Sequence, residues 1–192
     1  MPTAGRKIDS RSGFTLIELT LVIAIIGILV TMVVGSFMAS IRKSRDLERK
    51  ANLNQISKSL EMFYADRGRY PAKGLNGTIS ACDDYAAPND CTPNAKWSVM
   101  NGAQEILYMA LLPTDPRSGR YYYDTDANGT YYQLYANLEN QDDSDVHANG
   151  AGLKQTYNGT DCGLPATPVA CDYAVTSTNI QPYANSHDLT PP

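Results

Sequence analysis

Residues 13–41 read GFTLIELTLVIAIIGILVTMVVGSFMASI, and the only charged side chain among them is that of Glu18. The 23 positions from Leu19 to Ile41 carry no charge at all. A helix of that length, at about 1.5 Å per residue, spans the roughly 30 Å hydrocarbon core of a bilayer. The sequence therefore predicts a membrane-spanning helix near the N-terminus.

A short polar leader precedes this segment and carries three basic residues, like the first part of a secretory signal peptide. A conventional signal peptide is one alternative, but the apolar run is longer than the usual stretch of about 7–15 residues, and no small-x-small cleavage site follows it. Glu18 is the unusual feature, because a carboxylate in an apolar helix is costly unless it is paired or reaches the interface. Either Glu18 reaches the lipid headgroups, or a cut after Gly13 creates an α-amino group on Phe14 that Glu18 of a neighbouring subunit neutralises.

The motif Gly13-Phe14-Thr15-Leu16-Ile17-Glu18-Leu19 and the apolar run after it resemble the prepilin signature of type IV pilins and type II secretion pseudopilins. The resemblance implies that a membrane-embedded prepilin peptidase removes residues 1–13 and methylates the new N-terminal residue, Phe14. Glu18 then corresponds to the glutamate that helps to register subunits during filament assembly. Unlike many pilins, the chain has no proline between Phe14 and Tyr70.

The flanking charges are a second departure, because basic residues are more numerous after the apolar run than before it. Taken alone, this bias favours the opposite membrane orientation. Long domains translocate largely regardless of flanking charge, so we still expect the region after the helix to lie outside the cytoplasm.

Apolar residues continue at helical spacing beyond the predicted membrane segment. They are Leu47, Leu53, Ile56, Leu60, Phe63 and Tyr64. This spacing predicts one helix from Phe14 to about Asp66, with Gly68 as its C-cap and Pro71 preventing any continuation. The apolar stripe is the expected contact face for a globular head, and a coiled-coil partner is the alternative.

The rest of the chain has the patterns of a small α+β head. Ala72–Lys96 is predicted to be a polar loop and Trp97–Leu112 a short helix. Arg120–Tyr123 and Thr130–Leu138 are predicted strands, joined as a hairpin by the Asp- and Asn-rich turn between them. From Glu139 onward we expect irregular structure.

The predicted fold class is therefore α+β, with a long N-terminal helix packed on a small antiparallel β-sheet head. The predicted organisation has four parts. These are a leader at 1–13 that is removed, a transmembrane and assembly helix at 14–41, its amphipathic continuation at 42–70, and a globular head at 71–192.

The four cysteines form two pairs with the same eight-residue gap. They are Cys82 and Cys91, then Cys162 and Cys171. An even number of cysteines in loop-rich sequence predicts disulfides and an environment outside the reducing cytosol. Three connectivities are possible, and we favour two local bridges because each closes a short loop at small entropic cost. A zinc site is the alternative, but there is no C-x2-C spacing, and the only histidines, His147 and His187, lie far apart in the sequence.

Charge is distributed unevenly along the chain. Up to Tyr70 there are 11 basic and 6 acidic residues, and after it there are 5 basic and 14 acidic residues. Such an acidic head argues against nucleic acid as a main partner. Nothing in the sequence resembles a catalytic nucleophile with its base, and no glycine-rich phosphate loop follows a strand, so we do not expect an enzyme.

Calcium is the one cofactor that the sequence suggests. Residues 124–129, DTDANG, match the opening of an EF-hand loop, with Asp124, Asp126 and Asn128 as candidate ligands. The twelfth position holds Tyr135 in place of the required Glu, and a plain hairpin turn explains the same residues. A second candidate is Asp142–Asp145, because the resemblance to major pseudopilins implies a calcium loop after the strands, although no ligand matches residue by residue.

These features predict a structural subunit that polymerises through its N-terminal helix. By resemblance, its partners are further copies of itself, a prepilin peptidase, an assembly ATPase, a polytopic platform protein and the membrane. It would lie in the bacterial cytoplasmic membrane before assembly and in an extracellular or periplasmic filament afterwards. Our first expectation is a type IV pilus subunit for adhesion, motility or DNA uptake. The alternatives are a major pseudopilin of type II secretion and, from another class, a monomeric membrane-tethered binding protein.

Overall fold

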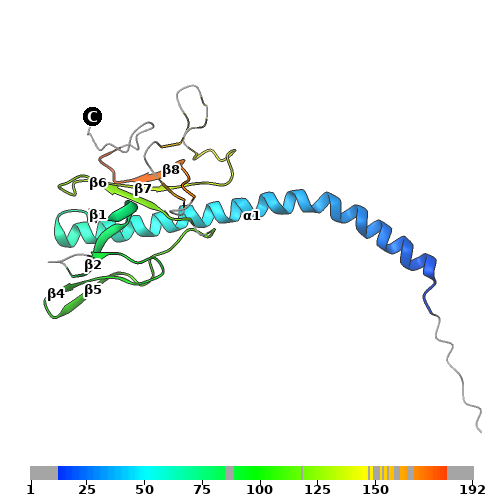
Figure 1. The fold of residues 1–192 in the computed structure, drawn as a ribbon, viewed down its shortest axis with the longest axis horizontal. Coiled ribbons are helices and arrows are strands. Elements are labelled where there is room, and N and C mark those ends of the chain that lie inside the picture. The colour runs from blue at the N-terminus through cyan, green and yellow to red at the C-terminus, as the bar shows by residue number, and fades with distance from the viewer. Residues whose placement is uncertain are drawn as a thin grey trace, which may run out of the picture. The chain divides into compact units, whose positions relative to one another are not determined.

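The computed structural model divides the chain into two units, residues Met1–Ile41 and Arg42–Pro192. A single helix, α1 (Leu16–Arg67), begins in the first unit and ends in the second (Figure 1). The structure describes residues 13–84, 89–117, 119–146, 148, 152, 154, 156–157, 161–163 and 167–180, and for Met32–Ser36 and Asp84 it describes the backbone alone.

In the first unit the described side chains of α1 are almost all exposed. Among the described residues, no helix is both long enough and apolar enough to cross a membrane. Met32–Ser36, which fall within the predicted span, have side chains outside the described residues, as do residues 1–12 of the predicted leader.

In the second unit α1 turns a regular stripe of side chains toward the head. Its members follow the 3–4 spacing of one helix face and are buried: Asp46, Arg49, Leu53, Ile56, Leu60 and Phe63. The helix ends where the sequence predicts, because Gly68 adopts a φ of 71° and its N–H donates to the carbonyl of Tyr64 at 2.7 Å. The apolar members of the stripe form the main core with aromatic and aliphatic residues of two sheets.

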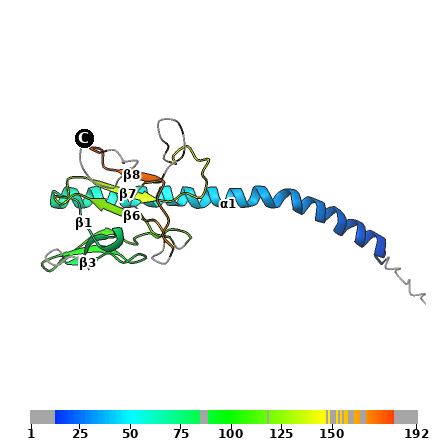
Figure 2. The same cartoon turned by 45° about the horizontal axis from the view of Figure 1, so that its top comes forward.

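The first sheet is built from the segment directly after α1. Its strands are β1 (Ala72–Lys73), β2 (Ile79–Asp84), β3 (Asn89–Asp90), β4 (Trp97–Asn101) and β5 (Gln104–Met109), with a 3-10 turn, η1 (Leu75–Gly77), after β1. The order is β1-β2-β4-β5, and β3 pairs with β2 off this path. In Figure 2, β3 lies below the part of α1 that belongs to the second unit. Every pairing is antiparallel except β2 with β4, which is parallel.

The prediction of a helix at Trp97–Leu112 is wrong, because the segment forms the β4–β5 hairpin. Asn101 pairs with Gln104 across a two-residue turn, in which Gly102 adopts a φ of 64°. A positive φ at the first turn position is typical of hairpins, and here it overrides the helical spacing of the apolar residues. The polar loop predicted at Ala72–Lys96 likewise contains β1, β2 and β3.

The second sheet contains the hairpin that the sequence predicts, and one strand that it does not. β6 (Tyr122–Thr125) and β7 (Tyr132–Ala136) pair antiparallel, and β8 (Tyr173–Thr176) pairs antiparallel with the other edge of β7. β8 lies in the tail that was expected to be irregular. Because Gln133–Ala136 supply its pairing partners, the strand depends on a contact distant in sequence.

Two local disulfides close loops in the head. Cys82 is bonded to Cys91, and Cys162 is bonded to Cys171, which is the connectivity favoured above. The second bridge packs with Tyr122, Tyr135 and Tyr157 in a separate cluster on the outer face of the β6–β8 sheet. One helix packed on largely antiparallel sheets confirms the predicted α+β fold class.

Candidate functional site

The prepilin-like motif lies at the start of α1, in the first unit. Phe14 is 90% exposed, and the helix begins two residues later, at Leu16. Gly13 is also exposed, and a side chain added there would meet nothing within 4 Å. The predicted cleavage position is therefore an accessible, non-helical junction in front of the helix.

Thr15 and Glu18 form a reciprocal cap on the first turn of α1. The Thr15 N–H and the Thr15 hydroxyl each donate to Glu18 Oε2 at 2.8 Å, and the Glu18 N–H donates back to Thr15 Oγ1 at 3.3 Å. This is a capping box, in which an N-cap threonine and the glutamate three residues later satisfy backbone donors that the helix leaves unpaired. Glu18 therefore has a role within the subunit itself, stabilising the turn next to Phe14.

The rest of α1 in the first unit presents large apolar side chains to its surroundings. Those from Leu16 to Val30 are 47–81% exposed: Leu16, Ile17, Leu19, Leu21, Val22, Ile23, Ile25, Ile26, Ile28, Leu29 and Val30. An apolar surface of this length is far beyond what a soluble monomer leaves in water. It requires an apolar environment, which either lipid or the helices of other copies can supply.

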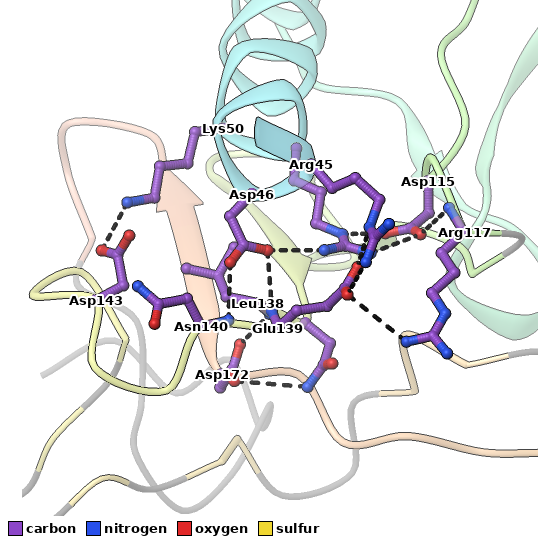
Figure 3. A network of polar contacts seen from close by, with 12 residues as sticks. Arg45, Asp46, Lys50, Asp115, Arg117, Leu138, Glu139, Asn140, Asp143 and Asp172 are labelled. Atoms are coloured by element: carbon purple, nitrogen blue, oxygen red, sulfur yellow. Dashed lines mark hydrogen bonds and ion pairs between the residues drawn. The ribbon is translucent and has the colours of Figure 1, made fainter. Parts of the chain in front are cut away.

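In the second unit a buried arginine, Arg49, joins α1 to two loops of the head. Figure 3 labels the three carboxylates that it contacts, Asp46, Asp115 and Glu139. Arg49 is 3% exposed, and its Nε and Nη2 donate to the two carboxylate oxygens of Asp115 at 2.5 and 3.0 Å. Its Nη1 donates to Asp46 Oδ1 at 2.7 Å, and its Nη2 lies 3.0 Å from Glu139 Oε1. Burial alone would lower the pKa of Arg49, but the bonds to Asp115, Asp46 and Glu139 raise it above its usual value. The arginine is therefore charged and fully engaged.

Glu139 receives further arginines at the edge of this network. Arg45 donates to both of its oxygens, with its Nε at 2.7 Å from Oε1, and Arg117 lies 3.6 Å from Oε2. The hydrogen bonds from Arg45, together with Arg49, lower the pKa of Glu139 to about 2, against the opposing effect of desolvation. Three arginines thus face the three carboxylates of Asp46, Asp115 and Glu139, so the charges balance.

Two buried carboxylates also fix the backbone of the loop after β7. Asp46 accepts the N–H groups of Glu139 and Asn140 at 2.9 and 2.8 Å, and Asp172 accepts the N–H of Leu138 at 2.7 Å. Burial raises the pKa of Asp172, and nearby Asp46 adds to the effect. The loop is therefore tied to α1 through Asp46 and to the start of β8 through Asp172.

Comparison with known proteins places the chain among filament subunits. Residues 8–40 match the family model described as the prokaryotic N-terminal methylation motif. The chain is 31% identical over 115 residues to the type II secretion system core protein G of Klebsiella michiganensis, covering 59% of this chain and 72% of that protein. The chain belongs to the family of type IV pilins and type II secretion pseudopilins. This confirms the resemblance carried by the Gly13–Leu19 motif.

Other pilin-family relatives include both kinds of filament subunit. The core protein G of Pseudomonas aeruginosa is 27% identical, covering 66% of this chain and 82% of that protein. The type IV major pilin protein PilA of Myxococcus xanthus is 40% identical over 58 residues, covering 30% of this chain and 26% of the pilin. No solved structure matches the chain. These relatives favour the pseudopilin alternative over our first expectation of a pilus subunit.

Two of the three calcium ligands predicted in this pilin-family head, Asp124 and Asp126, have other partners. Asp124 is buried, and its Oδ1 lies 2.9 Å from Lys73 Nζ. Asp126 accepts the N–H groups of Asn128 and Thr130 at 3.2 and 2.5 Å, as an aspartate does in a hairpin turn. Across the described part of the chain, no group of three or more His, Cys, Asp or Glu side chains is placed to hold a metal ion. Calcium at this turn stays a prediction.

The arginine network is the part of the pilin-family subunit that sequence reasoning missed. A usable signal was present, because Asp46 and Arg49 are in phase with the apolar stripe that continues at Leu53 and Ile56. Charged residues on the buried face of an amphipathic helix need partners, so their phase predicts an ion network in the head.

Proposed function

We propose that the chain is a pseudopilin, a structural subunit that polymerises through α1 into a filament of the type II secretion class. One observation supports this choice over a pilus subunit: the match to core protein G covers 115 residues, more than twice the 52 residues of α1, and so includes part of the head. The match to the pilin covers only 58 residues.

In this proposal the two units have separate tasks. Removal of residues 1–13 leaves Phe14 with a free α-amino group at the edge of an apolar helix. Before assembly the apolar side chains of residues 14–41 lie in lipid, and afterwards they lie among the same segments of other copies. The transfer exchanges one apolar environment for another, so it costs little free energy of desolvation.

Glu18 is the residue proposed to guide this transfer. In the single subunit its carboxylate caps the first turn through Thr15 Oγ1 and the Thr15 N–H. These contacts use Oε2, and they hold the carboxylate at the N-terminal end of the helix. The amine of Phe14 on a neighbouring copy would pair with this charge in an apolar setting, where an unpaired charge is costly.

The head is proposed to be held as one body with its part of α1. Arg49 of the helix bonds Asp115 in the loop before β6 and lies 3.0 Å from Glu139 in the loop after β7, and the apolar stripe of α1 packs against both sheets. A subunit that is moved through its helix then carries its head with it. An assembly ATPase and a platform protein are the partners proposed to supply this movement.

The test is the N-terminus of the chain in a sheared or overassembled filament fraction, measured by mass spectrometry. We expect a chain that starts at N-methylated Phe14. Gly13→Leu should leave residues 1–13 attached and remove the chain from filaments, whereas Glu18→Leu should give a processed chain that assembles poorly. Gly27→Leu, which also changes a glycine with open space around it, is the control for processing. An intact Met1 on a chain confined to the membrane would instead support a monomeric tethered binding protein.

A type IV pilus subunit is the second candidate, favoured by the 40% identity to the Myxococcus xanthus pilin. A strain that lacks the gene separates the two. Loss of secreted enzymes from the medium with normal surface motility supports the pseudopilin. Loss of surface pili or motility with normal secretion supports the pilus subunit.

A further inference from the structure

Residues 142–146, in the loop after β7, are the second place where the sequence suggests calcium. Asp142, Asp143 and Asp145 supply carboxylates, and the resemblance to major pseudopilins implies a calcium ion in a loop after the strands. Calcium takes six to eight oxygen ligands, drawn from carboxylates, backbone carbonyls and water. The fit of this loop to calcium therefore depends on what already contacts its oxygen atoms.

The ammonium group of Lys50 contacts two of the carboxylates. Its Nζ lies 2.7 Å from Asp143 Oδ1 and 2.7 Å from Asp145 Oδ2 (Figure 3 shows Lys50 with Asp143). Lys50 projects from α1, and its side chain is 16% exposed. Its Nζ also lies 5.6 Å from the centre of the Tyr173 ring in β8, a favourable position for a cation.

A second ammonium group contacts the backbone of the same loop. Lys154 Nζ donates to the carbonyl oxygens of Asp143 and Val146, at 2.6 and 3.4 Å. The two lysines together contact two carboxylate oxygens and two carbonyl oxygens. These are the kinds of ligand that calcium prefers, and here cationic side chains already engage all four.

The electrostatics of the loop agree with this geometry. Lys50 and Lys154 carry two positive charges against the three negative charges of Asp142, Asp143 and Asp145, so the lysines offset two of the three carboxylate charges. Desolvation would lower the pKa of Lys50, but its bonds to Asp143 and Asp145 raise it. The bond from Lys50 is also the main cause that lowers the pKa of Asp143. Both groups are therefore ionised near neutral pH.

We propose that the ammonium groups of Lys50 and Lys154 take the place of a metal ion in the loop of residues 142–146, so that this head folds without calcium. The residues present do not fit a calcium site, because the ion would have to displace both lysines from its ligands. This inference does not rest on the proposed function, since it concerns the folding of the head in any filament.

The test compares melting temperatures of the full chain in detergent micelles, with about 1 mM calcium chloride or with excess EDTA. The wild-type chain should melt at the same temperature in both. Lys50→Gln leaves Asp143 and Asp145 facing each other without their cation, so its melting temperature in EDTA should fall by about 3–8 °C. Calcium should restore part of this loss, because the carboxylate oxygens are then open to a hard cation.

Lys58→Gln is the matched control, because it removes the same charge from an exposed position on α1. It should change the melting temperature neither in calcium nor in EDTA.

If Lys50→Gln does not fold, a second variant keeps the test open. Lys50→Gln/Asp143→Asn removes one positive and one negative charge, so it should melt within a few degrees of wild type, with no response to calcium. A wild-type chain that is destabilised by EDTA or stabilised by calcium overturns the proposal. So does a Lys50→Gln chain that matches wild type or ignores calcium, or a double variant that fails to fold.

Discussion

Both parts of α1 depart from the usual distribution, in which apolar side chains are buried and charged side chains are exposed. The first part exposes apolar side chains, and the second buries charged ones. In the first unit, apolar residues such as Leu16 and Ile25 are 81% and 51% exposed. In the second unit, Asp46 and Arg49 are 1% and 3% exposed. Soluble proteins seldom expose such a run of large apolar residues, and they seldom bury charges without partners.

The difference shows which contacts the subunit makes with itself and which it leaves for other molecules. The buried charges have partners in the same chain, because Arg49 pairs with Asp46 and also with Asp115 and Glu139. In the described part of the first unit the apolar side chains are exposed, and we propose that lipid or other copies of the chain cover them. In this proposal the second unit supplies the stability of the subunit, and the first supplies its associations.

Removing the central arginine should produce the largest effect on stability. Arg49→Leu leaves Asp46 and Asp115 buried without their shared cation, and breaking a buried ion pair from one side costs about 3–5 kcal/mol. Denaturant unfolding of the full chain in micelles, followed through the near-ultraviolet signal of the head, measures this loss. The slope with denaturant should stay unchanged if only stability is affected.

Arg42→Leu is the matched control, because Arg42 is exposed on the same helix. A surface substitution of this kind should change the free energy of unfolding by no more than about 0.5 kcal/mol. If Arg49→Leu and Arg42→Leu lower the free energy of unfolding equally, the buried ion pairs of Arg49 do not stabilise the head.

The second effect is a loss of stability in acid. The pKa of Glu139 falls from its usual 4.5 to about 2 in the folded head, so the folded state favours the charged form. The ionised Glu139 carboxylate therefore contributes fully to the free energy of unfolding above pH 4.5, and this contribution is lost as the pH falls toward 2. At about 1.4 kcal/mol for each pH unit, this amounts to about 3 kcal/mol. Asp172 acts with the opposite sign, because burial raises its pKa.

Unfolding free energies measured from pH 6 to pH 2 test this prediction. Glu139→Gln should be less stable than wild type at pH 6, and its stability should depend less on pH. If the two profiles stay parallel down to pH 2, Glu139 is not the group that gives the head its sensitivity to acid.

Sequence predicted the features that depend on neighbouring residues. The Gly13–Leu19 motif, the end of α1 at Gly68 and the turn between β6 and β7 are all coded within a few positions. In Trp97–Leu112 the spacing of apolar residues is compatible with a helix, and Gly102 in the turn between Asn101 and Gln104 is the local feature that favours a hairpin.

The network around Arg49 was out of reach because its partners are distant in sequence. Asp115 lies 66 residues beyond Arg49, and Glu139 lies 94 residues beyond Arg45. Strand β8 was missed for the same reason, since its partner β7 ends at Ala136 and β8 begins only at Tyr173. The phase of Asp46 and Arg49 predicts that partners exist without saying which residues they are.

The smallest effect is expected at the capping box, where a charge in the first unit is engaged within the chain. Thr15→Val keeps the shape of the side chain but removes the hydroxyl that bonds Glu18, and loss of such a cap costs about 0.5–2 kcal/mol. Faster amide hydrogen exchange in the first turn of α1, measured in micelles, should report it. Thr20→Val is the control, because the Thr20 hydroxyl donates to the carbonyl of Ile17 and does not contact Glu18, so its loss should leave that exchange unchanged.

The same comparison can be made in filaments. There Glu18 is proposed to pair with the amine of a neighbouring Phe14, so the difference in exchange between Thr15→Val and wild type should shrink. A difference of equal size in micelles and filaments would mean that Glu18 keeps its capping role after assembly.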